Sequence, residues 1–169
     1  MEQVILVDEY DNELSTEEKQ KAHVDARLHR AFSIYIFNSK GQLLVHQRAK
    51  TKYHCAGLWA NTCCSHPRPD ENLFKAAHRR LKQEMGLSAG LKKVMSFIYK
   101  IRFDNGLTEH EYLHVLIGKT DQDPKPNPEE VEDWKWVNLE DLKKDIKENP
   151  DKYAYWFKVT LNKINSETL

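Results

Sequence analysis

Cysteine is scarce in this sequence, and the few cysteines present are badly spaced for disulfide bonds. Only three occur in 169 residues. Cys63 and Cys64 are neighbours, which are poorly placed to bridge each other, and Cys55 is left over. The pattern excludes a disulfide framework, so we expect a reducing, cytoplasmic setting.

An excess of one charge and a long apolar run are also missing. Lysine plus arginine and aspartate plus glutamate both number 26, so the chain has no basic surplus to attract nucleic acid. No run approaches the roughly 18 apolar residues of a membrane helix. The first residues have neither the basic start nor the apolar stretch of a signal peptide. We therefore expect no nucleic-acid partner and no membrane association.

Internal repeats, low-complexity tracts and linkers are absent as well. A length of 169 residues suits one ordinary domain with a sizeable core. We therefore predict a single domain spanning residues 1–169. The sequence leaves the oligomeric state open, with a monomer slightly favoured.

What the sequence does contain is a series of strand-like and helix-like segments. Apolar, β-branched and alternating residues predict strands at residues 4–7, 31–37, 42–47, 94–103, 108–119 and 131–137. Residues 15–22 are charged and are expected to form a short helix or a loop. Helices are predicted over residues 70–86, from the N-cap Asn138 to about Glu148, and from about Pro150 onward. This order predicts an α/β layered sandwich.

The stretch from residue 59 to residue 87 carries the densest group of reactive side chains. Cys64 and His66 lie two residues apart, so an extended backbone would place both on one side. Pro67 ends that strand, because proline lacks the N–H that a strand ladder needs. Arg80 and Glu84 lie one turn apart on the following helix. Its apolar stripe is predicted to comprise Phe74, Ala77, Leu81 and Met85, with Gly86 as the stop.

Two other groups have both a functional and an ordinary interpretation. Glu109 and Glu111 would point the same way on a strand, where like charges repel unless a cation or a shared proton lies between them. The ordinary interpretation is an exposed edge strand. His23 and His29 do not share a helical face, so they are either surface histidines or metal ligands supplied from a loop.

Cations and aromatic residues pose the same choice. Arg48, Lys50 and Lys52 are either a solvated face or a clamp for a diphosphate. Trp156 lies on an aromatic stripe of the last helix, and such stripes are usually core.

The stretch that begins at Ser65 resembles the signature of the Nudix family. That signature is a glycine, five residues, a glutamate, seven residues, and then Arg-Glu-apolar-x-Glu-Glu-x-Gly-apolar. Six positions agree here: Glu71, Arg79, Leu81, Glu84, Gly86 and Leu87. The leading glycine is replaced by Ser65 and two glutamates by Arg80 and Gln83. Those glutamates help Nudix hydrolases hold the magnesium that activates water, so their loss weakens a hydrolase interpretation.

The degenerate signature follows Asn61-x-x-Cys64-x-His66-Pro67, and this combination resembles the type 1 isopentenyl-diphosphate isomerases. The resemblance runs from about Val4 to Trp156. It implies a Nudix-type α/β/α sandwich with a mixed β-sheet and flanking helices. It also implies conversion of isopentenyl diphosphate to dimethylallyl diphosphate, a reaction of isoprenoid biosynthesis on a small-molecule substrate.

The resemblance further implies roles for individual residues. The acid–base pair would be Cys64 and Glu111, with Tyr99 supporting the glutamate and Trp156 facing a carbocation. A metal site for Mn²⁺, Mg²⁺ or Zn²⁺ would comprise His23, His29, His66, Glu109 and Glu111. A Mg²⁺ that arrives with the substrate would bind Glu84. The cations for the diphosphate would be Arg48, Lys52, Arg80 and one of Lys19 and Lys21.

Two rival functions remain compatible with the fold. A Nudix hydrolase would act on other diphosphates, but Arg80 and Gln83 occupy positions of its metal ligands. A silent binding domain would have no need of Cys64, His66 and the paired glutamates.

Overall fold

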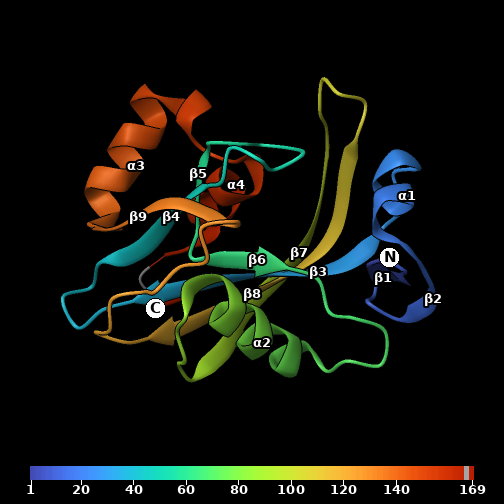
Figure 1. The fold of residues 1–169 in the computed structure, drawn as a ribbon, viewed down its shortest axis with the longest axis horizontal. Coiled ribbons are helices and arrows are strands. Elements are labelled where there is room, and N and C mark those ends of the chain that lie inside the picture. The colour runs from blue at the N-terminus through green and yellow to red at the C-terminus, as the bar shows by residue number, and fades with distance from the viewer. Residues whose placement is uncertain (166–167) are drawn as a thin grey trace.

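The structure is a computed structural model and describes residues 1–165 and 168–169. Nine strands in the described residues form one mixed sheet, shown in Figure 1. The strands are β1 (Gln3–Val7), β2 (Glu13–Glu18), β3 (His29–Phe37), β4 (Leu43–Arg48), β5 (Trp59–Ala60), β6 (Cys63–Ser65), β7 (Leu91–Arg102), β8 (Thr108–Lys119) and β9 (Val131–Val137). The helices are α1 (Lys19–Val24), α2 (Leu73–Met85), α3 (Leu139–Glu148), the 3-10 turn η1 (Pro150–Lys152) and α4 (Tyr155–Lys163).

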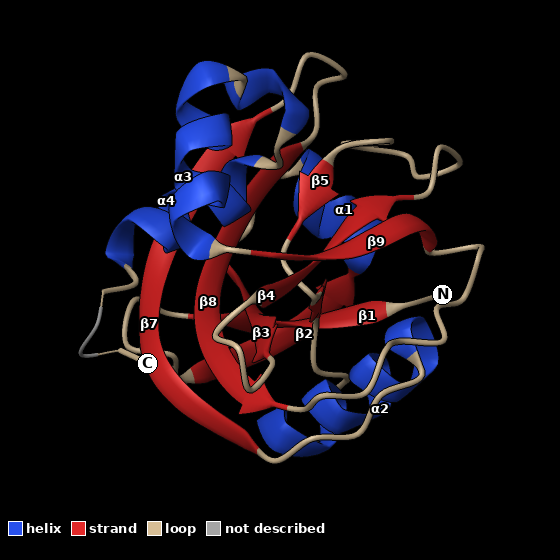
Figure 2. Ribbon diagram, turned by 90° about the vertical axis from the view of Figure 1, so that its left-hand side faces the viewer, coloured by secondary structure: helices blue, strands red, loops and turns tan. Residues whose placement is uncertain are grey.

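Strand β3 is the centre of the molecule, and its side chains alternate between two cores. Phe32, Ile34 and Ile36 pack with the apolar face of α2. Tyr35 and Phe37, on the opposite face, pack with side chains of α3 and α4. Figures 1 and 2 show α2 on one side of the sheet and α3 and α4 on the other. The period of two along a strand thus produces the predicted α/β/α sandwich with a mixed sheet.

The pairing partners of β3 position the site residues. Strand β8 runs parallel to β3 and places Glu111 opposite His29. Strand β6 pairs antiparallel on the other edge of β3 and places Cys64 opposite Ser33. The predicted β7–β8 hairpin forms over almost its whole length, with Tyr99 opposite Glu111. Cys64 and Tyr99 are therefore placed beside the first half of β3, where both line one pocket.

The predicted hairpin of β3 and β4 is present only at its turn. Phe37 and Leu43 form its one register pair among the described residues. Beyond that pair the strands separate, because β6 joins β3 while β5 and β9 join β4. Residues of both strands, including Ser33 and His46, line a pocket at this separation.

Most of the apolar stripe and the glycine stop predicted for residues 70–86 are present in helix α2, but the helix begins later than predicted. Asn72 is its N-cap and accepts a hydrogen bond from the Phe74 N–H at 2.9 Å. Gly86 ends it with φ of 65°, and a Cβ there would lie 2.6 Å from the Lys125 carbonyl oxygen. Phe74 is wrongly placed in the apolar stripe, since it is 38% exposed. The buried face instead includes Ala76 and Glu84, because the helix turns that flank toward the sheet.

Two other predicted elements also differ. Part of residues 15–22 belongs to the edge strand β2, which pairs with β1 through the backbone and buries little. A charged edge strand lacks the alternation that would reveal it in the sequence. The last helix starts at Tyr155, not near Pro150, because Tyr153 first forms a parallel bridge with Trp59. No helix in the described part of the chain is long and apolar enough to span a membrane.

Candidate active site

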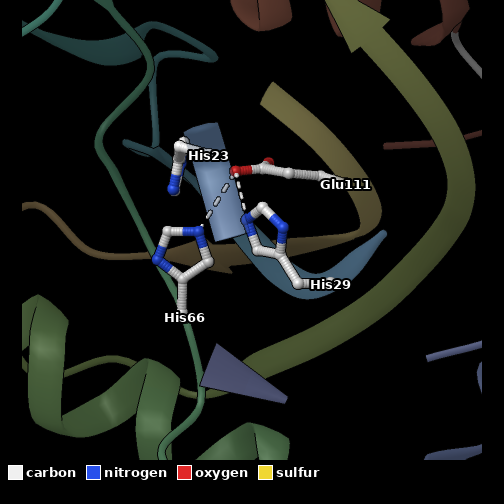
Figure 3. A group of neighbouring side chains, drawn as sticks. All are labelled: His23, His29, His66 and Glu111. Carbon is white, nitrogen blue, oxygen red and sulfur yellow. Dashed lines mark hydrogen bonds and ion pairs between the residues drawn. The ribbon is translucent and has the colours of Figure 1, made fainter. Parts of the chain in front are cut away.

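Three histidines and one glutamate meet at a buried point beside β3. His23 comes from α1, His29 begins β3, His66 follows β6, and Glu111 lies in β8. Each offers one donor atom within 4.8 Å of the others. Figure 3 shows the rings of His29 and His66 directed at the same carboxylate oxygen, with His23 beside them. The structure thus brings together four of the five residues predicted to hold a metal.

The backbone fixes which nitrogen of two of these histidines is available. The Nδ1 of His23 lies 2.6 Å from the Lys19 carbonyl oxygen, and that of His29 lies 2.8 Å from the Arg27 carbonyl oxygen. A carbonyl only accepts, so each Nδ1 carries the proton and each Nε2 presents a lone pair. Both Nε2 atoms are buried without a hydrogen-bond partner in the described residues. Carbonyls that orient imidazoles in this way are typical supports of metal ligands.

Glu111 faces these lone pairs with its own acceptor oxygen. Its Oε1 lies 3.1 Å from the Nε2 of His66 and 3.7 Å from the Nε2 of His29. Burial lowers the pKa of His66 to about 4, which favours a neutral ring. The Nε2 of His29 and the Glu111 carboxylate both accept, so a cation or a proton is needed between them. The residues present therefore fit a divalent ion.

Glu109 belongs to an adjoining group. It forms a second set of potential metal ligands with His23 and His54. Tyr99 links the two groups, because its hydroxyl oxygen lies 2.8 Å from an oxygen of both Glu109 and Glu111. Burial, aided by the charge of Glu111, raises the pKa of Glu109 to about 8. The exposed-edge interpretation of the two glutamates is wrong, since both are buried.

The two neighbouring cysteines face opposite sides of β6. Cys64 lines the pocket together with Tyr99, Glu111 and the other site residues. Cys63 lies on the α2 side, with its Sγ 3.4 Å from Glu84. Burial raises the pKa of the Cys64 thiol, so the thiol is protonated at neutral pH.

Asn61 ties Trp156 to the strand that carries the cysteines. Its side-chain oxygen accepts a hydrogen bond from the Trp156 indole N–H at 3.0 Å. Its amide group donates to the carbonyl oxygens of Ile34 and Cys63. Trp156 is 2% exposed, packs in the core and also lines the pocket, with the Arg48 guanidinium 5.2 Å from its ring centroid. Trp156 is therefore both a core residue and a residue of the pocket lining.

Cations gather in the pocket, and carboxylates pair with three of them; Lys19 pairs with Glu2 at 3.1 Å. Arg48, Lys52, Arg80 and Lys19 all line the pocket. Lys52 pairs with Glu130, and Arg80 pairs with both Glu84 and Glu130. Lys21 does not line the pocket; it pairs at the surface with Asp25 and Glu17. Of the two lysines left open by the sequence, only Lys19 lies where a substrate could meet it.

Two residues of the pocket, His54 and Glu130, carry no signal in the sequence. A single histidine in a loop carries no spacing signal, and Glu130 lies in a run of acidic residues that is typical of a solvated surface. Both line the pocket, and both contact a predicted site residue. Each was brought there by tertiary contacts.

Comparisons with known proteins agree with this arrangement. The NUDIX domain family matches residues 27–157. A protein of Aromatoleum aromaticum named "Isopentenyl-diphosphate Delta-isomerase 2" is 48% identical over 165 residues, which cover 98% of this chain and 87% of that protein. A Photorhabdus laumondii protein of the same name is 50% identical over 166 residues, which cover 98% and 94% of the two chains.

The fold is shared more widely than the sequence. The crystal structure of DR0079 from Deinococcus radiodurans aligns with a TM-score of 0.80 at 18% identity, and covers 96% of this chain and 98% of that one. Identity at that level supports the fold alone. The family match over residues 27–157 and the relatives that match nearly the whole chain also support membership of a sequence family. This chain belongs to the isopentenyl-diphosphate Delta-isomerases of the Nudix superfamily.

Proposed function

We propose that this protein converts isopentenyl diphosphate to dimethylallyl diphosphate. The relatives that carry the name of this activity match nearly the whole chain. The observation that supports the proposal best is one pocket that contains a partly buried thiol, buried carboxylates and four cations. Lys19 and Trp156, near opposite ends of the chain, both line it, so we propose that residues 1–169 act as one domain.

The reaction moves a double bond without net loss or gain of atoms. A proton is added to the terminal alkene carbon, and another is removed from the carbon next to the one that bears the diphosphate. Because an alkene is a very weak base, the acid must be well positioned and shielded from water. We assign the acid–base pair to Cys64 and Glu111. They come from β6 and β8, on opposite edges of β3, so they can address opposite faces of a substrate between them.

Tyr99 and Trp156 have supporting roles in this proposal. The Tyr99 hydroxyl contacts both buried glutamates and fixes the orientation of their carboxyl groups. Protonation of the alkene produces a positive tertiary carbon, which the π face of Trp156 would stabilise. The hydrogen bond from its indole to Asn61 holds the ring in place.

Two metal positions belong to the proposal. His23, His29, His66, Glu109 and Glu111 would hold one divalent ion, and their nitrogen and oxygen donors suit Mn²⁺, Mg²⁺ or Zn²⁺. The bound ion would supply the positive charge that two buried carboxylates need to lie side by side. Glu84 would hold a Mg²⁺ that arrives with the diphosphate. Arg48, Lys52, Arg80 and Lys19 would bind the diphosphate oxygens.

One incubation separates this function from its rivals. The protein is mixed with isopentenyl diphosphate, Mg²⁺ and Mn²⁺, and the products are followed by NMR. We expect dimethylallyl diphosphate, with Cys64→Ala as a matched inactive variant. Release of phosphate would instead indicate a Nudix hydrolase. Recovery of unchanged substrate from a metal-loaded protein would indicate a binding domain. Arg80 and Gln83 replace ligands that a hydrolase needs, which argues against the first rival.

A further inference from the structure

His54 lies in the loop between β4 and β5, and no motif of the sequence assigns it a role. Its side chain is 9% exposed. The ring stacks on Phe103 with centroids 5.5 Å apart and planes inclined by 9°. It also meets the ring of Trp156 edge-on at 6.2 Å. These contacts hold the imidazole in one orientation inside the pocket, where a surface histidine would turn freely.

The nitrogen atoms of His54 point toward potential metal ligands. Its Nε2 lies 3.4 Å from the Oε1 of Glu109, and its Nδ1 is buried with no partner in the described residues. His54, Glu109 and His23 each offer a donor atom within 4.8 Å of the others. His23 also belongs to the group of His29, His66 and Glu111. The two groups therefore share His23.

The separation of His54 and Glu109 suits two ligands of one ion better than a hydrogen bond. Good hydrogen bonds from nitrogen to oxygen measure about 2.7 to 3.2 Å. Two ligands that are each about 2.1 Å from an ion lie about 3.0 Å apart at a right angle and about 3.4 Å apart at a tetrahedral angle. The observed 3.4 Å falls at the upper end of that range.

We propose that His54 is a further ligand of the divalent ion in the His/Glu site. Its neighbours Glu109 and His23, both predicted ligands of that ion, connect it to the site. This inference depends on the proposed function only because it assumes that the divalent ion is bound. Glu109 is the predicted ligand that lies outside the main group, and His54 contacts its carboxylate. The donors proposed for the ion would then be four imidazoles and two carboxylates, a set that suits Mn²⁺, Zn²⁺ or Co²⁺.

Co²⁺ substitution tests the proposal without reference to activity. Each histidine bound to Co²⁺ gives one strongly shifted, exchangeable ring N–H signal in the proton NMR spectrum. We expect four such signals in the native sequence and three in His54→Ala and His54→Phe. The phenylalanine keeps the stacking on Phe103 but has no ligand atom. The Co²⁺ dissociation constant should rise about tenfold or more in both variants.

His78 provides a matched control, because it is exposed on α2 and does not line the pocket. His78→Ala should keep all four signals and the native dissociation constant. Three signals in both the native protein and His54→Phe would overturn the proposal and leave His54 as a neighbour of Glu109 only. Failure of the proposed function is recognised separately, as Co²⁺ binding with four signals but no isomerisation by the Mn²⁺-loaded native protein.

Discussion

Cys63 and Cys64 are adjacent in the chain, yet only Cys64 faces the pocket. Cys64→Ala should therefore lower kcat by roughly 100-fold or more, since it removes a proton-transfer group. Cys63→Ala should stay within a few-fold of the native protein, because it loses one weak contact with Glu84. Both variants should remain folded, as checked by their melting temperatures. The reverse pattern of activities would show that our assignment of the two thiols is wrong.

Trp156 has both a packing role and a proposed electrostatic role, and two substitutions separate them. Trp156→Phe and Trp156→Leu both lose the hydrogen bond to Asn61, so both should lower the melting temperature. Only Phe keeps a π face, so its kcat should fall less than about tenfold, while Leu should lose at least tenfold more. KM for the diphosphate should change little in either variant. Equal kcat values in the two folded variants would end the cation-stabilising role.

The predicted metal ligands and the residues proposed to bind the Mg²⁺-diphosphate come from different elements. His66 follows β6, whereas Glu84 lies on α2 and contacts Arg80. Elemental analysis should find a tightly held metal in the native protein, and His66→Ala should release it. Glu84→Gln should keep that metal and weaken binding of a Mg²⁺-diphosphate complex. Metal retained at full occupancy in a His66→Ala, Glu109→Gln double variant would rule the site out.

Glu130, just before β9, places its own negative charge between two of the cations that are proposed to bind the diphosphate, Lys52 and Arg80. It pairs with Lys52 and Arg80, which come from a loop and from α2. A diphosphate must compete with this carboxylate for the same two cations. Glu130→Gln should therefore bind inorganic pyrophosphate several-fold more tightly than the native protein when Mg²⁺ is absent, as measured by calorimetry.

Glu132 offers a matched control for this test. It pairs with the exposed Lys50 at 3.7 Å and does not line the pocket, so Glu132→Gln removes the same charge elsewhere. Its pyrophosphate affinity should equal that of the native protein. Weaker binding by Glu130→Gln would contradict competition and would show that Glu130 holds the cations in position for the substrate.

For the whole molecule, buried neutral histidines predict a loss of stability in acid. Burial lowers the pKa of His46 to about 4, while the unfolded chain has the ordinary value of about 6.5. The unfolded state therefore binds a proton as pH falls below 6.5 and the folded state does not. The stability that the neutral His46 ring contributes is present in full above pH 6.5 and is lost progressively down to pH 4. At pH 5 the loss from this residue is about 2 kcal/mol.

Chemical denaturation at pH 7 and pH 5, with a chelator present, measures this loss. The His46 Nδ1–H donates to the Asn61 carbonyl oxygen, and an asparagine amide can make the same bond without titrating. His46→Asn should therefore reduce the difference in unfolding free energy between the two pH values. His78→Asn, at an exposed position, should leave that difference unchanged. An unaltered difference in His46→Asn would show that this histidine does not contribute to it.

Short-range patterns in the sequence were sufficient for several features of the protein. The β7–β8 hairpin follows from alternating residues around an Asp-Asn-Gly turn, and Glu109 and Glu111 share a face because a strand has a period of two. Asn138 caps α3 as predicted, because its side chain accepts from an N–H two residues ahead. Cys63 and Cys64 face opposite sides of β6 for the same reason. Each of these depends on neighbours within a few residues.

Only the tertiary structure decided which distant residues meet. The parallel register of β3 and β8 sets His29 opposite Glu111, and no local period encodes that register. Tertiary contacts bring His54 to Glu109 and Glu130 to Lys52, and the turn of α1 sends Lys19, not Lys21, into the pocket. Local patterns in the sequence indicated most of the elements, though not β2, and the chemistry of their side chains. The composition of the site depended on long-range strand pairing and packing, which bring together residues that are far apart in the chain.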